Sequence, residues 1–164
     1  MRATRGVLIA GLASVLAYAD EPPKVDHQPI PCTLRDQPFT LCARISDDSA
    51  VVRARVLFRK AGEKYYSAID MAFGGLSYCA TLPAPRTKVV EYYVQAFDDK
   101  AQPERTGTHQ LRIVPEGQCD FPPVEQDPER TRSFTVYATA KEQGKGAPSG
   151  FAKEGVVVIP LRRR

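Results

Sequence analysis

Cysteine and aspartate are the residue types in this sequence whose spacing could support chemistry. The chain has four cysteines and two histidines, but it contains no C-x-x-C pair, and His27 and His109 lie outside the spacing of zinc ligands. In an exported chain an even number of cysteines instead indicates two disulfides, although one disulfide with two free thiols is an open alternative. The cysteines are Cys32, Cys42, Cys79 and Cys119.

Two aspartate pairs are the second candidate for chemistry. Asp47 and Asp48 form one pair, and Asp98 and Asp99 form the other. Carboxylate oxygens are the ligands that Ca²⁺ takes in proteins, so these four side chains could bind calcium if the fold brings them together. Aspartate is also a favoured turn residue, and both pairs occupy predicted turns, which accounts for them without a metal.

The sequence contains no pattern that predicts an enzyme. The serines stand in no G-x-S-x-G context, and the two histidines have no partner motif. Paired cysteines would leave no thiol nucleophile. We therefore predict that the protein is not an enzyme, and no residue pattern calls for a cofactor.

Residues 1–19 have the three parts of a secretory signal peptide in order. A basic segment at 1–5 precedes an apolar run at 6–16, and residues 17–19 form an A-x-A cleavage site. The apolar run is too short to span a bilayer. We therefore expect export to the periplasm or the extracellular space and no transmembrane segment; the alternative is an N-terminal helix packed in a core.

The distribution of charge argues against a nucleic-acid partner. The net charge of the whole chain is +4. Residues 20–128 hold 13 basic and 16 acidic side chains, whereas residues 129–164 hold 8 basic and 3 acidic ones. The globular part therefore lacks the positive field that nucleic-acid binding requires, and the basic excess belongs to the C-terminal tail.

Apolar and polar residues alternate with a period of two through much of the chain, which is typical of half-buried strands. In the clearest run, Val90, Tyr92 and Val94 alternate with Glu91 and Tyr93. No stretch of this region has a helical period. The predicted strands are 39–45, 52–58, 65–71, 76–82, 89–97 and 108–114, with a short one at 29–32. Other residues that the pattern turns inward include Val52, Val56, Tyr65, Leu76 and Leu82.

These strands predict an all-β fold with one principal domain. An extended lead-in at 20–26 precedes the domain, which we place at 27–116. A linker rich in proline and mixed charge follows at 117–132. The basic tail at 133–164 is expected to be partly ordered and could add further strands.

The order of several segments resembles the bacterial immunoglobulin-like, fibronectin type III-like domains of exported envelope proteins. Residues 39–48 resemble strand B, 52–59 strand C, 78–83 strand E and 90–98 strand F. The chain differs from antibody domains because it has no tryptophan and its cysteines do not face the core. The resemblance implies a single seven-stranded Greek-key sandwich that acts as a spacer, display or adhesion module, with no catalytic residues.

The resemblance also implies which cysteines pair. Strands B and E are neighbours in this fold, so it implies a disulfide between Cys42 and Cys79 on an outer sheet surface. Strands A and G end at the same end of the sandwich, which implies a disulfide between Cys32 and Cys119. Tyr92, near the start of strand F, would form a tyrosine corner.

Two surfaces of this expected fold could carry function. The loops after strands B and F meet at one end, which would gather Asp47, Asp48, Asp98 and Asp99 into a calcium site. Arginine and aromatic side chains would share the outer face of strands C, F and G, and such residues are enriched in protein interfaces. A solvated face in which arginine stems cover the rings is the alternative. The candidate face comprises Arg53, Arg55, Leu57, Tyr93, Phe97 and Arg112.

We therefore expect a structural or protein-binding module of the bacterial cell envelope whose partner is a protein or an envelope polymer. A calcium-dependent or glycan-binding adhesion module is the alternative.

Overall fold

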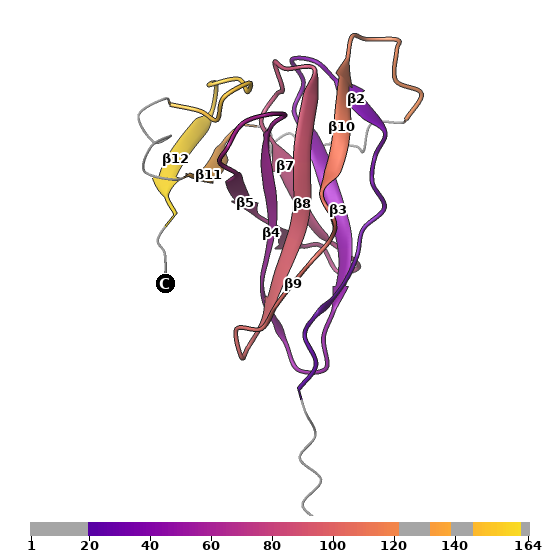
Figure 1. Ribbon diagram of the computed structural model, residues 1–164, viewed down its shortest axis with the longest axis vertical. Helices are drawn as coiled ribbons and strands as arrows, with labels where there is room; N and C mark the ends of the chain where they lie inside the picture. Colours follow the sequence, from indigo (N-terminus) through magenta and orange to yellow (C-terminus); the bar gives the residue numbers. More distant parts are fainter. Residues whose placement is uncertain (1–19, 122–131, 139–145, 162–164) are drawn as a thin grey trace, which may run out of the picture.

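The computed structural model describes residues 20–121, 132–138 and 146–161. The predicted signal peptide at 1–19 and most of the predicted linker lie outside the described residues. The described part is all-β: twelve strands form two sheets, and it contains no helix (Figure 1). Consequently, no helix in this part of the chain is long and apolar enough to cross a membrane.

The larger sheet has eight strands. Neighbouring strands pair antiparallel, except that β12 pairs parallel with β11 and β2 pairs parallel with β10. Its strand order is β12 (Val156–Pro160), β11 (Phe134–Ala138), β5 (Ser67–Asp70), β4 (Val51–Lys60), β8 (Val89–Asp98), β10 (His109–Val114) and β2 (Cys32–Leu34), and β9 (Pro103–Arg105) pairs with the last part of β8.

The smaller sheet has four strands, all antiparallel. Its order is β1 (Lys24–Asp26), β3 (Phe39–Ser46), β7 (Tyr78–Leu82) and β6 (Ala72–Phe73). The inner faces of the two sheets share one hydrophobic core, so the arrangement is that of a β-sandwich. Strand β1 lies within the segment that the sequence predicts as an extended lead-in.

Alternation of side chains across each strand explains how the core forms. In β8 every second residue is buried from Val90 to Asp98. Val56, Tyr92 and Leu82 are each fully buried, as the period-two pattern predicts. Because the core faces of both sheets follow the same period, a shift of one residue in register would expose every one of these side chains.

The number of strands is larger than predicted. The described residues form twelve strands in place of the expected seven. The predicted strand at 65–71 is shorter, Ser67–Asp70, and a separate strand follows it, because the chain leaves the larger sheet after Asp70 and enters the smaller sheet at Ala72. Strand β9 lies in a segment to which the sequence analysis assigned no strand, and its exposed Pro-Glu-Arg sequence has no apolar alternation.

Three residues that the pattern turns inward are not in the core. Val52 is 60% exposed, because the register of β4 against β8 shifts between Val51 and Arg53. Leu76 is 89% exposed, because it follows Gly75, whose positive φ of 90° forms the turn between β6 and β7. Tyr65 is only half-buried and precedes β5.

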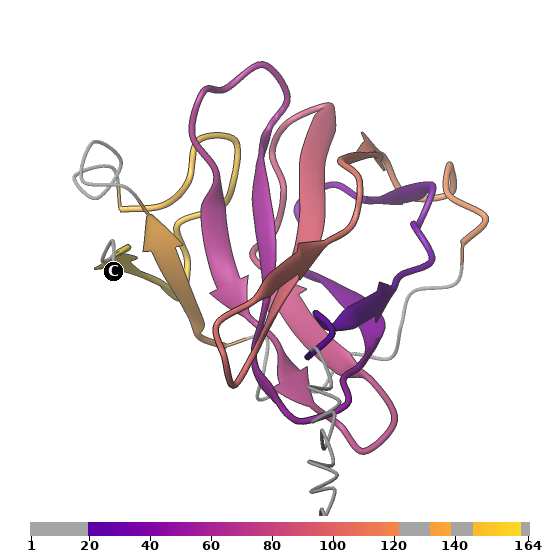
Figure 2. The same cartoon turned by 60° about the horizontal axis from the view of Figure 1, so that its bottom comes forward.

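The C-terminal segment contributes to the same sheet and core. β11 and β12 extend the larger sheet beyond β5, and they stand at one side of the molecule (Figure 2). Phe134 and Val136 are buried in the core. Phe151 packs edge-on against Phe58 with ring centroids 4.9 Å apart. The described part of the tail is therefore packed against the sandwich.

Candidate functional site

Both disulfides join the cysteines that the sequence analysis paired. Cys42 and Cys79 lie directly opposite each other on β3 and β7, with Cα atoms 4.1 Å apart, and their side chains are on the outer face of the smaller sheet. Cys32 on β2 is linked to Cys119, which follows β10, with Cα atoms 5.8 Å apart. All four cysteines are therefore bridged, and none is available as a nucleophile or a metal ligand.

The candidate binding face lies on the outer side of the larger sheet. Leu57 on β4 pairs with Tyr93 on β8, and Arg53 pairs with Phe97, so these side chains are cross-strand neighbours. Arg55 lies between the two pairs along β4. Arg112 shares this face, but it pairs with Val89 at the other end of β8, roughly 26 Å along the strand from Phe97. The structure therefore brings five of the six predicted residues together.

Four further residues, which were not predicted to lie on this face, take part in stacks of an arginine on a tyrosine ring. They are Arg59, Tyr66, Arg105 and Tyr137. The guanidinium of Arg59 lies 4.2 Å from the ring centroid of Tyr66. Arg105 lies 5.0 Å from the ring centroid of Tyr93, and the two tyrosine rings meet edge to face at 5.1 Å. Farther along the sheet, Arg55 lies 4.8 Å from the ring of Tyr137. The stacks fix the direction of long side chains that are otherwise mobile.

Arg59 could have been found from the sequence, because it continues the outward alternation of Arg55 and Leu57. Tyr66 could also have been placed outward, because the predicted strand at 65–71 turns Tyr65 inward. Tyr137 could not, since it reaches the face only because β11 pairs with β5.

The arginines on this face outnumber its carboxylates. Arg55 forms an ion pair with Asp70, and Arg59 Nη2 lies 2.7 Å from Glu91 Oε2. The other three arginines, Arg53, Arg105 and Arg112, form no ion pair with any residue that the structure describes. Around Tyr93 and Tyr137, four arginines and two carboxylates leave two positive charges uncompensated, those of Arg53 and Arg105. Arg112 lies at the far end of the same face.

Burial and neighbouring charge shift the pKa values of the tyrosine hydroxyls on this face. Burial raises the pKa of the Tyr93 hydroxyl above its usual value, and the neighbouring Arg105 partly offsets this effect. Burial also raises the pKa of Tyr137, to which Asp70 adds through its charge and a hydrogen bond. Both phenols therefore remain neutral near pH 7, and neither is poised to act as a base.

Two of the four calcium candidates meet at the end of the sandwich, with a third aspartate that was not predicted. Asp20, Asp98 and Asp99 present carboxylate oxygens that all lie within 4.8 Å of one another. Asp47 is next to this group, because the Ser49 hydroxyl lies 2.7 Å from Asp47 Oδ1 and 3.0 Å from Asp99 Oδ1. Hydrogen bonds from Ser49 hold the pKa of Asp47 below its usual value.

Asp48 is not part of this aspartate group. Its side chain is exposed, because the turn after β3 directs it toward solvent. Asp20 was not predicted, because it is far away along the chain and reaches the group only through the path of the N-terminal segment.

A histidine–tyrosine cluster joins the two sheets on the other side of β8. His27 Nδ1 donates to the carbonyl of Cys42 at 2.7 Å, so its Nε2 accepts the Tyr92 hydroxyl at 2.9 Å. Tyr92 also accepts a hydrogen bond from the backbone of Ile30, but burial dominates and raises its pKa to about 12. The contact with Ile30 joins Tyr92 to the N-terminal segment, and not to backbone a few residues upstream as in the predicted tyrosine corner. The bond to His27 was not predicted. The ring of His109 lies 5.4 Å from that of Tyr92.

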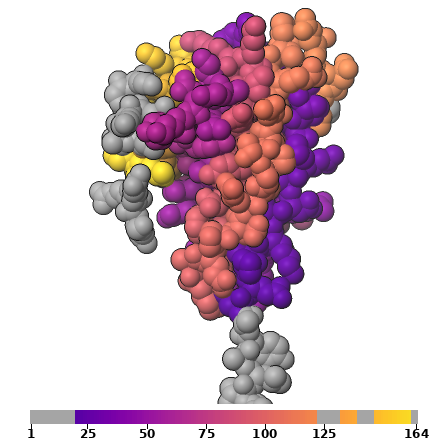
Figure 3. Space-filling view, viewed as in Figure 1, coloured from indigo at the N-terminus to yellow at the C-terminus, as the bar shows by residue number. Residues whose placement is uncertain are grey.

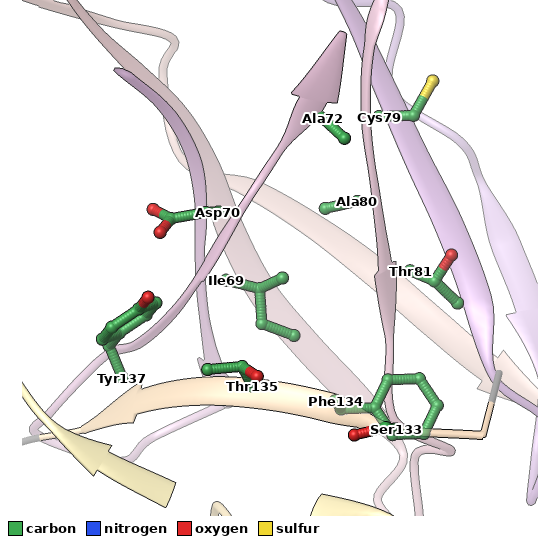
Figure 4. Close-up of a pocket in the computed structure, with 10 residues that line it drawn as sticks. All are labelled: Ile69, Asp70, Ala72, Cys79, Ala80, Thr81, Ser133, Phe134, Thr135 and Tyr137. Carbon is green, nitrogen blue, oxygen red and sulfur yellow. The ribbon is translucent and has the colours of Figure 1, made fainter. Parts of the chain in front are cut away.

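An open pocket of about 280 Å³ lies where the edges of the two sheets diverge. Its walls come from β5, β6, β7 and β11, and include Ile69, Thr81 and Phe134 (Figure 4). Its carboxylate, Asp70, is already engaged by Arg55 and by the Tyr137 hydroxyl. The hydroxyl residues Thr81, Ser133 and Thr135 also line the pocket, but neither histidine is among its lining residues, so none of these hydroxyls has a histidine base beside it there.

No protein-family model matches the chain, and no curated protein matches its sequence. The chain's own residues are therefore the basis for a functional proposal.

Proposed function

We propose that the protein is a non-enzymatic module, exported to the bacterial cell envelope, that binds an acidic segment of another protein through the outer face of its larger sheet. The observation that carries this proposal is the set of arginines stacked on tyrosines across β4, β8, β9, β11 and the segment before β5. We call this the arginine–tyrosine face and define it by Arg53, Arg55, Leu57, Arg59, Tyr66, Tyr93, Phe97, Arg105 and Tyr137.

Rigid, amphipathic side chains support a role for this face in binding. An interface that must first order flexible side chains loses about 0.5–1.5 kcal/mol for each one. Here the stacks of Arg59 on Tyr66 and of Arg105 on Tyr93 already restrict the arginines. Arginine and tyrosine are also enriched among the residues that dominate binding energy.

Charge complementarity supports an acidic partner. The uncompensated arginines of this face, among them Arg53 and Arg105, would attract carboxylates and pair with them in bidentate geometry. Binding to an acidic segment would then weaken as salt concentration rises. If the face is only solvated and has no partner, these arginines contact water and bind no acidic segment.

Strand order supports an immunoglobulin-like Greek key as the finer fold. The orders β1-β3-β7-β6 and β5-β4-β8-β10-β2 correspond to strands A-B-E-D and C′-C-F-G-A′ of such domains. The parallel pairing of β2 with β10 fits a first strand that crosses between sheets. In this interpretation β11 and β12 extend the C′ edge of an otherwise standard sandwich.

Two disulfides support export. Disulfides persist in oxidising compartments such as the periplasm and the extracellular space, and they are rare in the cytosol. Together with the predicted signal peptide at 1–19, the bridges Cys32–Cys119 and Cys42–Cys79 favour a periplasmic or extracellular location.

A calcium-dependent adhesion module is the second candidate, and the group of Asp20, Asp98 and Asp99 is the observation in its favour. Glycan binding is less well supported. The rings of Tyr66 and Tyr93 each already stack against an arginine, and the chain has no tryptophan, so these rings have less free surface for a sugar to stack on.

A pull-down from envelope extract with matched charge reversals tests the proposal. The bait carrying Arg53→Glu and Arg105→Glu should lose an acidic protein that the unaltered bait retains at low salt. Arg35→Glu with Arg44→Glu is the control, because it makes the same charge change at exposed sites away from this face. Equal retention by both variants, or equal loss from both, would contradict the proposal.

A further inference from the structure

We infer that Asp20, Asp98 and Asp99, with Asp47 beside them, form a calcium-binding site that ties the N-terminal segment to the turn after β8. This inference is independent of the proposed protein-binding face, which lies on a sheet surface rather than at the loops. It differs from the sequence hypothesis in its members, since Asp20 takes the place of Asp48.

The separation of the carboxylate oxygens suits one ion. Ca²⁺ binds oxygen ligands at 2.3–2.6 Å, so two ligands of one ion lie no more than about 5 Å apart. The oxygens of Asp20, Asp98 and Asp99 all lie within 4.8 Å of one another. One calcium ion could therefore contact all three side chains after small rotations about their side-chain bonds.

Asp98 provides a second observation that points to a cation. Its side chain is fully buried, with 0% exposure. Oδ1 accepts the backbone N–H groups of Lys100 at 2.9 Å and Gln102 at 2.7 Å, whereas Oδ2 has no hydrogen-bond partner among the described residues. A buried carboxylate oxygen without a partner is costly, and a metal ion is one of the groups that can compensate it.

The carboxylates at this site outnumber the cations, so a divalent cation would compensate negative charge. Four carboxylates meet here, from Asp20, Asp47, Asp98 and Asp99. Among the described residues the ammonium of Lys100 is the cation in contact with them, and it touches Asp20 Oδ1 and lies 3.7 Å from Asp99 Oδ1. The hydrogen bond to Asp20 raises the pKa of Lys100. Because about half of the Lys100 side chain is exposed, it could swing into solvent when an ion binds.

Calcium suits this group better than magnesium. Mg²⁺ demands nearly octahedral geometry and keeps several waters, whereas Ca²⁺ accepts six to eight oxygens in flexible arrangements. The carboxylates come from three separate chain segments: the N-terminal segment, the turn after β3 and the end of β8. Asp47 Oδ2 is a further buried oxygen without a partner among the described residues. Water would complete the shell.

Binding would brace the narrow end of the molecule. Gln102 Nε2 already donates to Asp20 Oδ2 at 2.6 Å, and in Figure 3 the first described residues lie against the segment near residue 100. An ion shared by Asp20 and Asp98 would add a further link between these segments, which are far apart in the sequence. We therefore expect calcium to order the N-terminal segment.

Calorimetric titration of the protein with CaCl₂ tests the site. We expect saturable binding of one ion with a Kd of about 10⁻⁴–10⁻³ M, the range of extracellular calcium modules, and weaker binding of MgCl₂. Asp98→Asn keeps Oδ1 as an acceptor for the two backbone N–H groups, so the turn should survive, but binding should weaken at least about tenfold because one charged ligand is lost. Asp48→Asn removes the same charge from an exposed side chain outside the group and is the matched control.

Lys100→Met provides a second test, in which no carboxylate of the site and no acceptor of the turn after β8 is changed. Removal of the competing ammonium should tighten calcium binding several-fold. A flat titration of the unaltered protein at millimolar CaCl₂ would overturn the inference. The same holds if Asp98→Asn binds as tightly as Asp48→Asn, or if Lys100→Met binds no better than the unaltered protein.

Discussion

The hydroxyl of Tyr92 should contribute measurably to stability because it joins the two sheets. Replacing Tyr92 with Phe keeps the fully buried ring and removes only the oxygen that contacts His27 Nε2 and the backbone of Ile30. A buried or half-buried partner left unsatisfied costs about 1–3 kcal/mol. Since His27 is only half-buried, we expect a loss of about 1–2 kcal/mol in the free energy of unfolding, or about 2–8 °C in Tm.

Urea denaturation followed by circular dichroism measures this loss, with Tyr78→Phe as the control. The Tyr78 hydroxyl has no hydrogen bond to a described residue, so the control should change stability by less than about 0.5 kcal/mol. A double-mutant cycle with His27→Ala should give a coupling of at least about 0.5 kcal/mol. Equal stability of the two phenylalanine variants, or additive effects of Tyr92→Phe and His27→Ala, would refute the assigned contact.

The remaining predictions concern pH, the disulfides and the C-terminal segment. Burial lowers the pKa of His27 and of His109 below 6.5, so the folded state binds fewer protons than the unfolded chain. The contribution of these histidines to stability should therefore be complete above about pH 6.5 and be lost as the pH falls below it. Urea midpoints measured at pH 7.5 and 5.5 would reveal this loss. Replacing Cys42 and Cys79 together with Ala opens a loop of 37 residues and should cost about 4 kcal/mol on the chain-entropy model, measured by the same denaturation. Phe151→Ala should cost about 3–5 kcal/mol if the C-terminal segment is part of the core, whereas a loss below about 1 kcal/mol would show that this segment is dispensable.

Local alternation is the reason that the core could be predicted from the sequence. Val56, Leu82 and Tyr92 sit in runs where apolar and polar residues alternate, and a strand with one buried face requires that order. The pattern failed at Val52 and Leu76, where a register shift and a glycine turn release the chain from the sheet. Those departures depend on backbone geometry that residue types alone did not reveal.

The candidate sites were predicted only in part, because their members come from distant segments. Leu57 and Tyr93 could be placed on one face from the alternation of two strands. Tyr137 joins that face through the pairing of β11 with β5, and Asp20 joins Asp98 through the path of the N-terminal segment. Neither juxtaposition follows from a local period, since both depend on which strands become neighbours.

Side-chain footprinting with hydroxyl radicals, in the presence and absence of the protein partner retained by the bait, shows whether that partner binds to the arginine–tyrosine face. The partner should protect Leu57, Tyr93 and Phe97 on this face, while Phe73 and Leu76, exposed at the β6–β7 turn, should stay equally reactive. Protection of Phe73 and Leu76 with unchanged reactivity of Leu57, Tyr93 and Phe97 would contradict binding at this face.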